Sequence, residues 1–304
     1  MMSILQRVGA LIMAPLAAAK LSYLVNHPPR PGAPRNPENS GLTPVELKIP
    51  VPGSSGRIHG WLFPGDSGRV VAVGHSIGAE KSRSLPYAKF LAEAGYTVLL
   101  FDFRNHGQSF DDGAFSGYSR RFADDLTAVV KHVRAMPGYA DSRWALYGLS
   151  MSSFAAVHVL SRLDCIEAVV CDSGPTADPG AAVDNLMRIG LLPVPEAMRK
   201  GPARAVLETV FRPLTALSMS TPKPWPPVAD RPEYDVPMLF IVGDADTVVD
   251  PDDVRALAEP FPRSELVLVA GAGHLRAMST DRAAYQGRVL EFLAKALGEP
   301  GSES

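Results

Sequence analysis

Cysteine is scarce in this chain of 304 residues, which contains only Cys165 and Cys171. If the segment between them is extended, the two lie roughly 20 Å apart at about 3.3 Å per residue. A disulfide requires Cα atoms within about 7 Å of each other. We therefore expect two free thiols, which are typical of a reducing compartment. No group of Cys and His residues has the spacing of metal ligands, so the sequence predicts no metal site.

An excess of charge of one sign is also missing. The formal net charge is −2 and the sequence contains no run of like charges. The bulk charge therefore gives no sign of a nucleic-acid partner or of an anionic surface. The length and a hydrophobic content of 46% suit one large globular domain, or one domain with an insertion.

Uninterrupted apolar runs are few, and residues 1–25 come nearest to one. Ala17-Ala18-Ala19 before Lys20 resembles the cleavage site of a signal peptide, which would imply a secreted or periplasmic protein. Pro15 and Lys20 argue against a membrane-spanning helix, which needs about 20 clean apolar residues. An uncleaved helix, packed on the domain or lying on a membrane, would suit a cytoplasmic or membrane-associated protein. These interpretations stay open.

From residue 41 to residue 304 we expect one domain, preceded by the apolar helix and a proline-rich arm within residues 1–40. Strand-like and helix-like segments alternate from residue 45 onward, which favours a mostly parallel sheet covered by helices on both faces. The first two strands follow each other closely, so they predict an antiparallel hairpin at one edge. The expected strands are 45–49, 58–63, 70–73, 97–101, 144–147, 167–171, 238–242 and 266–269.

The alternation breaks once, at about residues 174–235. A gap this long in a compact pattern indicates an insertion, which we interpret as a helical lid. Helix-like stretches within it span 181–190 and 203–211. Its large apolar side chains either hold an acyl chain or simply pack the lid onto the domain: Leu186, Met187, Ile189, Leu191, Leu192, Met198, Phe211, Met219 and Trp225.

Two serine motifs compete for the role of nucleophile. GHSIG, around Ser76, matches G-x-S-x-G in every letter, whereas GLSMS, around Ser150, lacks the last glycine. A nucleophile elbow requires a strand, a sharp turn and a helix that begins at once. Only Ser150 has this context, because a polar stretch follows Ser76 before the next helix. Ser76 also follows an early strand, which we expect near the edge of the sheet.

This arrangement resembles the α/β-hydrolase family over residues 42–297, and most closely its bacterial esterase and serine-peptidase-like branch. The segment DFRNHGQS is similar to that branch's Asp-x-Arg-Gly-His-Gly-x-Ser, with Asn105 in place of a glycine. In GHSIGAEKS, Ser76 stands where the branch usually has glycine. The resemblance makes this segment the oxyanion loop, and it implies that the backbone N–H groups of Ile77 and Met151 are the oxyanion donors.

The general base is expected to be His274, which follows the last strand on a glycine-rich turn. The chain order of nucleophile, acid and histidine is that of α/β-hydrolases. The family pattern Gly-x-x-Asp selects Asp246 as the acid, and Asp172 is the alternative. We expect Asp244 to stabilise its own turn and Asp250 to cap a helix.

The sequence thus predicts a serine hydrolase that cleaves carboxylic esters or related acyl bonds of a small-molecule substrate, through an acyl-enzyme and without a cofactor. A thioesterase, a peptidase or an acyltransferase would use the same triad. A non-catalytic binding protein of the same fold is a hypothesis from another class.

Overall fold

The computed structural model describes residues 3–30, 32, 34–190, 192–221, 223–225, 227 and 231–301. Eight strands form one sheet in the order β1-β2-β4-β3-β5-β6-β7-β8. β2 runs antiparallel to β1 and to β4, and every other neighbouring pair is parallel. The expected α/β fold and the edge hairpin are confirmed. The strands are β1 Val45–Pro50, β2 Arg57–Phe63, β3 Asp66–Val73, β4 Tyr96–Phe101, β5 Arg143–Leu149, β6 Ile166–Asp172, β7 Met238–Gly243 and β8 Ser264–Val269.

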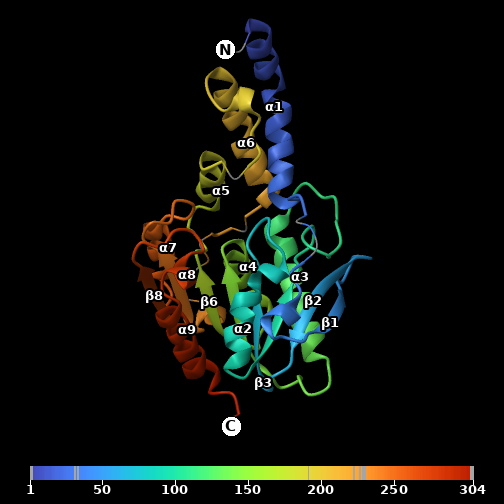
Figure 1. Cartoon of the computed structure of the whole chain (residues 1–304), viewed down its shortest axis with the longest axis vertical. Coiled ribbons are helices and arrows are strands. Elements are labelled where there is room, and N and C mark those ends of the chain that lie inside the picture. The colour runs from blue at the N-terminus through green and yellow to red at the C-terminus, as the bar shows by residue number, and fades with distance from the viewer. Residues whose placement is uncertain are drawn as a thin grey trace.

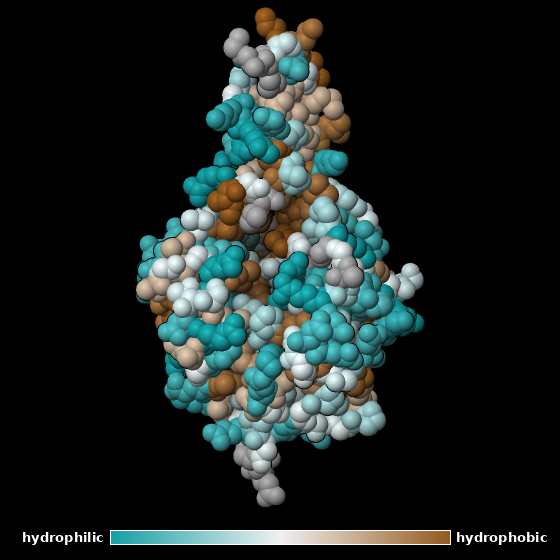
Figure 2. Space-filling model, in the orientation of Figure 1, coloured by the Kyte–Doolittle hydropathy of each residue, from teal (hydrophilic) through white to brown (hydrophobic). Residues whose placement is uncertain are grey.

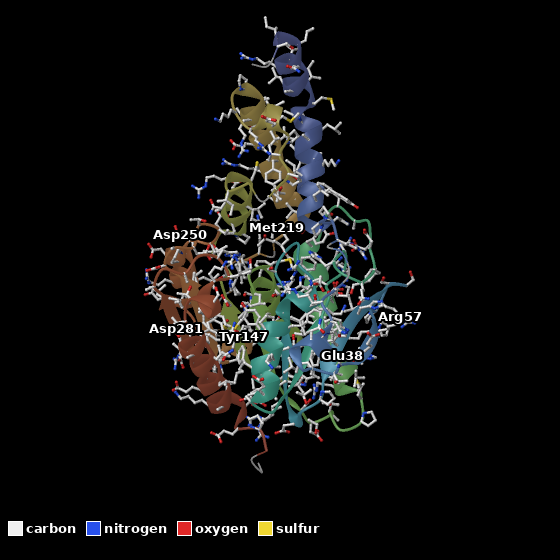
Figure 3. All side chains as sticks on the ribbon, in the orientation of Figure 1. Glu38, Arg57, Tyr147, Met219, Asp250 and Asp281 are labelled. Atoms are coloured by element: carbon white, nitrogen blue, oxygen red, sulfur yellow. The ribbon has the colours of Figure 1, made fainter. Side chains whose placement is uncertain are left out.

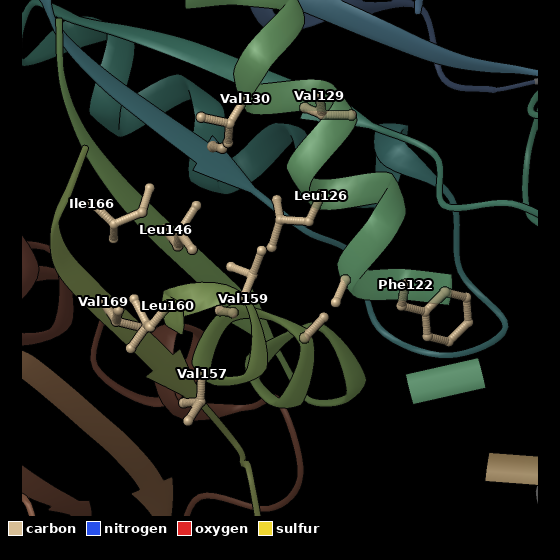
Figure 4. Close-up of a cluster of buried hydrophobic side chains, with 14 of the residues drawn as sticks. Phe122, Leu126, Val129, Val130, Leu146, Val157, Val159, Leu160, Ile166 and Val169 are labelled. Carbon is tan, nitrogen blue, oxygen red and sulfur yellow. The ribbon is translucent and has the colours of Figure 1, made fainter. Parts of the chain in front are cut away.

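Helices cover both faces of this sheet (Figure 1). One face carries α3 Tyr118–Arg134, α4 Met151–Val159 and α7 Pro251–Ala258, and the other carries α2 Leu85–Glu93, α8 Ala277–Thr280 and α9 Arg282–Leu297. The apolar stripe of α3 explains its position, because Phe122, Leu126 and Val129 recur on one helix face and are buried. Figure 4 shows this stripe packed with side chains of α4 and the sheet.

The position of β3 corrects one expectation. The strand that precedes Ser76 is not near an edge but lies fourth of eight, directly beside β5. The chain passes through α2 on one face to place β4 outside β3, and then through α3 on the other face to place β5 on the opposite side. The two strand ends at this reversal lie next to each other, which is where open α/β sheets bind ligands.

The remaining helices form an arm that projects from the sheet domain (Figure 1). It consists of α1 Ile4–Asn26, the 3-10 turn η4 Glu196–Met198 and α6 Pro202–Met219, with α5 Pro179–Arg188 at its base. The helices predicted at 181–190 and 203–211 are thus present, although α6 continues past Phe211. Further short 3-10 turns are η1 Pro37–Ser40, η2 Lys81–Ser84, η3 Leu160–Arg162 and η5 Pro232–Tyr234.

Segments from opposite ends of the sequence build this arm together. α1 packs along α6 through residues spaced three or four apart, which form one helical stripe on each. Ser22 Oγ lies 2.9 Å from Thr215 Oγ1, and Asn26 Nδ2 donates to Ser218 Oγ at 2.6 Å. The packed stripes are Ala10, Ala14, Ala18, Leu21 and Val25 on α1, and Ala203, Leu207 and Phe211 on α6.

The apolar residues expected in a lid lie in different surroundings. Met187, Met198 and Phe211 are buried in the core of the arm, against which Leu192 packs, whereas Ile189 is exposed. Trp225 packs its ring on Phe154, with the two centroids 4.1 Å apart. Leu186 and Met219 line the pocket described below. Leu191 lies outside the described residues.

Candidate active site

Ser150 occupies the turn between β5 and α4, and the helix begins at the very next residue. Its backbone is in a strained region, with φ at 55° and ψ at −111°. The turn closes because Gly148 has no side chain. A Cβ there would lie 2.3 Å from the Cα of Ser153. The strand, strained turn and immediate helix match the elbow expected for Ser150.

A continuous chain of hydrogen bonds joins the three side chains that the sequence selected. His274 Nε2 lies 3.0 Å from Ser150 Oγ, and His274 Nδ1 lies 2.8 Å from Asp246 Oδ2. The carboxylate of Asp246 accepts, so Nδ1 carries the proton and Nε2 is free to accept the serine proton. The Asp246 side chain is fully buried and is held by the N–H groups of Val248 and Val249.

The other aspartates have structural contacts. The carboxylate of Asp172 accepts from Tyr285 Oη at 2.6 Å and from Ser173 Oγ at 2.9 Å, rather than from His274. Asp250 caps α7 as expected, by accepting from the N–H of Asp252. The expectation for Asp244 was wrong in its partner, because its carboxylate accepts from the N–H of Gly271, 27 residues away. It thus ties the turn after β7 to the turn after β8.

Sequence reasoning missed a second support of the histidine loop. Ser173 Oγ accepts from the backbone N–H of Leu275 at 2.9 Å while it donates to Asp172. Ser173 and Leu275 both have positive φ, at 57° and 55°. Burial raises the pKa of the Asp172 carboxyl. No local motif marks this clamp, since its parts come from the ends of two different strands.

His75 holds the Ser76 loop in place, and both of its ring nitrogens are engaged in hydrogen bonds to backbone atoms. His75 is buried, its Nδ1 donates to the Ser76 carbonyl oxygen at 2.8 Å, and its Nε2 accepts from the N–H of Phe103 at 3.1 Å. The role expected for His75, which is to bond two loops together, matches this geometry. φ at Ser76 is not positive, so the backbone accommodates the Cβ that glycine would lack.

The DFRNHGQS loop lies beside the Ser76 loop, and its side chains support its backbone conformation and pair with buried charges. Asn105 has φ at 64°, a conformation that asparagine tolerates better than most residues. Arg104 donates to the buried carboxylate of Asp125 at 2.6 Å. Burial nevertheless raises the pKa of Asp125 to about 6, against the opposing effect of Arg104. The Asp102 carboxylate holds the N–H of Lys81 at 2.6 Å, so the loops pack around buried charges.

Comparison with known proteins identifies the family of this chain. A model of the alpha/beta hydrolase family matches residues 82–285, which is more than half of the chain. The chain belongs to this family. The uncharacterized protein YfhR of Escherichia coli K12 is 23% identical to this hydrolase over 253 residues, covering 79% of it and 78% of YfhR.

Solved esterase structures share the fold of the hydrolase. One structure of the Pyrococcus furiosus esterase Pf2001 superposes with a TM-score of 0.71 and 25% identity, covering 90% of this chain and 97% of that one. A thermophilic esterase from Thermogutta terrifontis superposes with a TM-score of 0.57 and 19% identity, covering 83% of this chain and 99% of that one. The fold and a general hydrolase activity are thus supported.

A pocket of this hydrolase opens beside Ser150, at the base of the arm. Its empty space is about 700 Å³, part of which is open to solvent. Figure 2 shows the hollow below the arm, with apolar residues around it, and Figure 3 places Met219 where α6 reaches it. Ile77 and Met151 line it too. Its other large lining side chains are Tyr118, Phe122, Phe154, Leu186, Val248 and Val249.

One cluster with ligand-type atoms lies outside this pocket. His27, Asp111 and Asp112 each place a nitrogen or oxygen within 4.8 Å of the others. Arg104 and Arg121 pair with Oδ2 of Asp112, so this carboxylate is already engaged in ion pairs. The fold brings these residues together from distant parts of the chain, so the spacing of Cys and His in the sequence does not reveal the cluster.

Proposed function

We propose that this hydrolase cleaves carboxylic esters through an acyl-enzyme on Ser150. His274 removes the proton from Ser150 as the general base and later protonates the leaving group. Asp246 holds the imidazole in the tautomer with Nδ1 protonated, and it stabilises the imidazolium that forms. The observation that carries the proposal is the unbroken chain of 3.0 Å and 2.8 Å hydrogen bonds from Ser150 through His274 to the buried Asp246.

The oxyanion donors proposed are the backbone N–H groups of Ile77 and Met151. Met151 is the first residue of α4, so its N–H lacks a partner within the helix and lies at the positive end of the helix dipole. Ile77 comes from the loop after β3, the strand that neighbours β5. Both residues line the pocket with Ser150. The loss of one such donor typically costs about 3 kcal/mol of transition-state stabilisation.

An apolar acyl group fits the lining of the pocket. Aromatic and aliphatic side chains of α3, α4 and α5 surround the space next to Ser150, which favours burial of a hydrocarbon chain over a charged group. The esterase names of similar solved structures support an ester as the first substrate class to test. Thioesters, amides and acyl transfer to another acceptor use the same triad and belong in the same assay.

The deciding experiment is intact-mass labelling with a fluorophosphonate, together with turnover of p-nitrophenyl esters. Wild type should gain one label, and Ser150→Ala should lose both the label and at least about 10⁴-fold in kcat/KM. Ser76→Ala is the matched control and should keep both. If Ser76→Ala abolishes labelling while Ser150→Ala keeps it, the proposed triad is wrong. Folded wild type that takes no label would instead favour a binding protein.

A further inference from the structure

The upper half of α1, from Ile4 to Leu16, presents apolar side chains to solvent. The stripe that packs on α6 begins only at Ala10, and residues 3–9 are all exposed. Figure 2 shows these apolar residues at the far end of the arm. An apolar patch of this kind marks an interaction site on a soluble domain. Seven large side chains have exposed fractions from 39% to 85%: Ile4, Leu5, Val8, Leu11, Ile12, Met13 and Leu16.

The length of this half restricts the partner. The whole of α1 is long and apolar enough to cross a membrane by length and composition. Its lower half, however, is engaged by α6 through the polar pairs Ser22–Thr215 and Asn26–Ser218. The segment from Ile4 to Leu16, of which Ala10 and Ala14 also pack in the arm, spans only about 20 Å at 1.5 Å per residue. A bilayer core is about 30 Å thick, so this half reaches into one leaflet without crossing.

The charge of the arm identifies the kind of surface. Residues 3–26 and 192–219 contain six Lys or Arg and two Glu, although the whole chain has a net charge of −2. Two of the six, Arg204 and Arg212, form ion pairs with Glu208 and with Asp184 of α5. No Asp or Glu precedes Glu38 in the sequence. Arg199 and Lys200 are exposed directly after η4, which packs on α1. Anionic headgroups attract Lys and Arg side chains. The net charge of the whole chain does not reveal that these residues are concentrated in the arm.

We propose that the upper half of α1 inserts into one leaflet of an anionic phospholipid membrane, with Arg199 and Lys200 at the headgroups. Asn26 and Met219, the last residues of α1 and α6, both line the pocket beside Ser150. Asn26 follows Leu16 by about 15 Å along the helix. Docking therefore holds the pocket close below the lipid surface. If the proposed esterase function holds, its substrates are apolar esters that partition into membranes.

Vesicle co-sedimentation of the full chain tests this proposal. The Ser150→Ala variant should bind phosphatidylcholine vesicles with about 30% phosphatidylglycerol, and binding should fall at about 0.5 M salt. The double variant Leu5→Glu, Ile12→Glu should bind at least about tenfold more weakly. The control Leu217→Glu changes another exposed large apolar residue, at the base of α6, and should bind like the parent. Because Ser150→Ala is the parent throughout, the result does not depend on hydrolysis.

Three results would overturn the proposal. The first is equal vesicle binding by the double variant and its parent. The second is a stable dimer in sedimentation velocity that the double variant dissociates, since a second copy would then cover the patch. The third is a change in the role of α1 itself. An intact mass from cells that lacks α1 would indicate a cleaved signal, and membrane-bound protein that resists alkaline extraction would indicate a spanning helix. Circular dichroism confirms that each variant is folded.

Discussion

The two serine loops at the centre of the sheet have similar sequence motifs but different surroundings. GHSIG follows β3 and GLSMS follows β5, and the two strands are neighbours. Ser150 has a strained backbone, an immediate helix and a histidine 3.0 Å from its hydroxyl oxygen. Ser76 has no positive φ, and its loop continues into a 3-10 turn before α2. The comparison teaches that the surrounding elements, rather than the pentapeptide, make a serine a nucleophile.

The two loops differ most in how tightly their glycines are packed, so Gly148→Val should have the largest effect among the changes considered below. Its Cβ would meet the backbone of Ser153, which forces α4 away from β5 and moves Ser150 relative to His274. We expect kcat/KM to fall at least about 100-fold, because a shift of roughly 1 Å in a reacting group costs that much. Ester turnover and thermal melting measure the two effects.

Gly78→Ala is the matched change in the other loop. A Cβ there would meet nothing nearer than Pro28 at 4.0 Å, but φ is +71°. We expect a loss of about 1–2 kcal/mol of stability with activity kept within several-fold of wild type. A Gly148→Val variant as active as Gly78→Ala would contradict the interpretation of the elbow.

His75→Ala should have the next largest effect. It removes two bonds that fix the Ser76 loop, which carries the proposed oxyanion donor Ile77. We expect kcat/KM to fall about 10- to 30-fold, which is part of the cost of losing an oxyanion donor. Fluorophosphonate should still label Ser150 at long times. Activity within threefold of wild type would mean that this loop does not stabilise the oxyanion.

Acid should loosen the Ser76 side before the elbow. Burial lowers the pKa of His106 to about 3, with His75 adding to the effect, and an unfolded histidine has a pKa of about 6.5. The unfolded state therefore binds the proton first. The contribution of His106 to the free energy of unfolding is complete above pH 6.5 and falls as the pH drops towards 3, by on the order of 2 kcal/mol at pH 5.

Urea unfolding at pH 7 and pH 5 measures this loss, and hydrogen exchange locates it. Amides of residues 75–81 and 103–109 should lose protection at pH 5 before those of 148–156. His106→Phe should flatten the pH dependence. A variant as sensitive to acid as wild type would remove His106 as the cause.

Ser76→Gly should have the smallest effect. It restores the residue usual in similar oxyanion loops, at a position whose backbone already accepts a side chain. Activity should stay within about threefold of wild type, and stability should fall by about 0.5–1 kcal/mol through the greater freedom of the unfolded chain. A loss of activity comparable to that of Ser150→Ala would mean that Ser76 itself takes part in the chemistry.

The candidate site was more predictable than the arm. Ser150, Asp246 and His274 each follow their own strand, and each is marked by a short local pattern that the structure joins by hydrogen bonds. The pairing of α1 with α6 has no such pattern, because it joins residues almost 200 positions apart through helix faces of small residues. The place of β3 was also mispredicted, since chain order alone does not say on which side a crossover returns.

The sequence by itself determined the eight strands, the elbow at Ser150 and the order of nucleophile, acid and histidine, because backbone propensity, apolar periodicity and turn chemistry are local properties. Only the tertiary structure showed that Asp246 bonds to His274 while Asp172 bonds to Tyr285, that β3 lies beside β5 and that α1 packs on α6. Those outcomes depend on which surfaces contact each other. The hydrophobic effect is not directional, so an apolar surface in the sequence does not say which other surface will cover it.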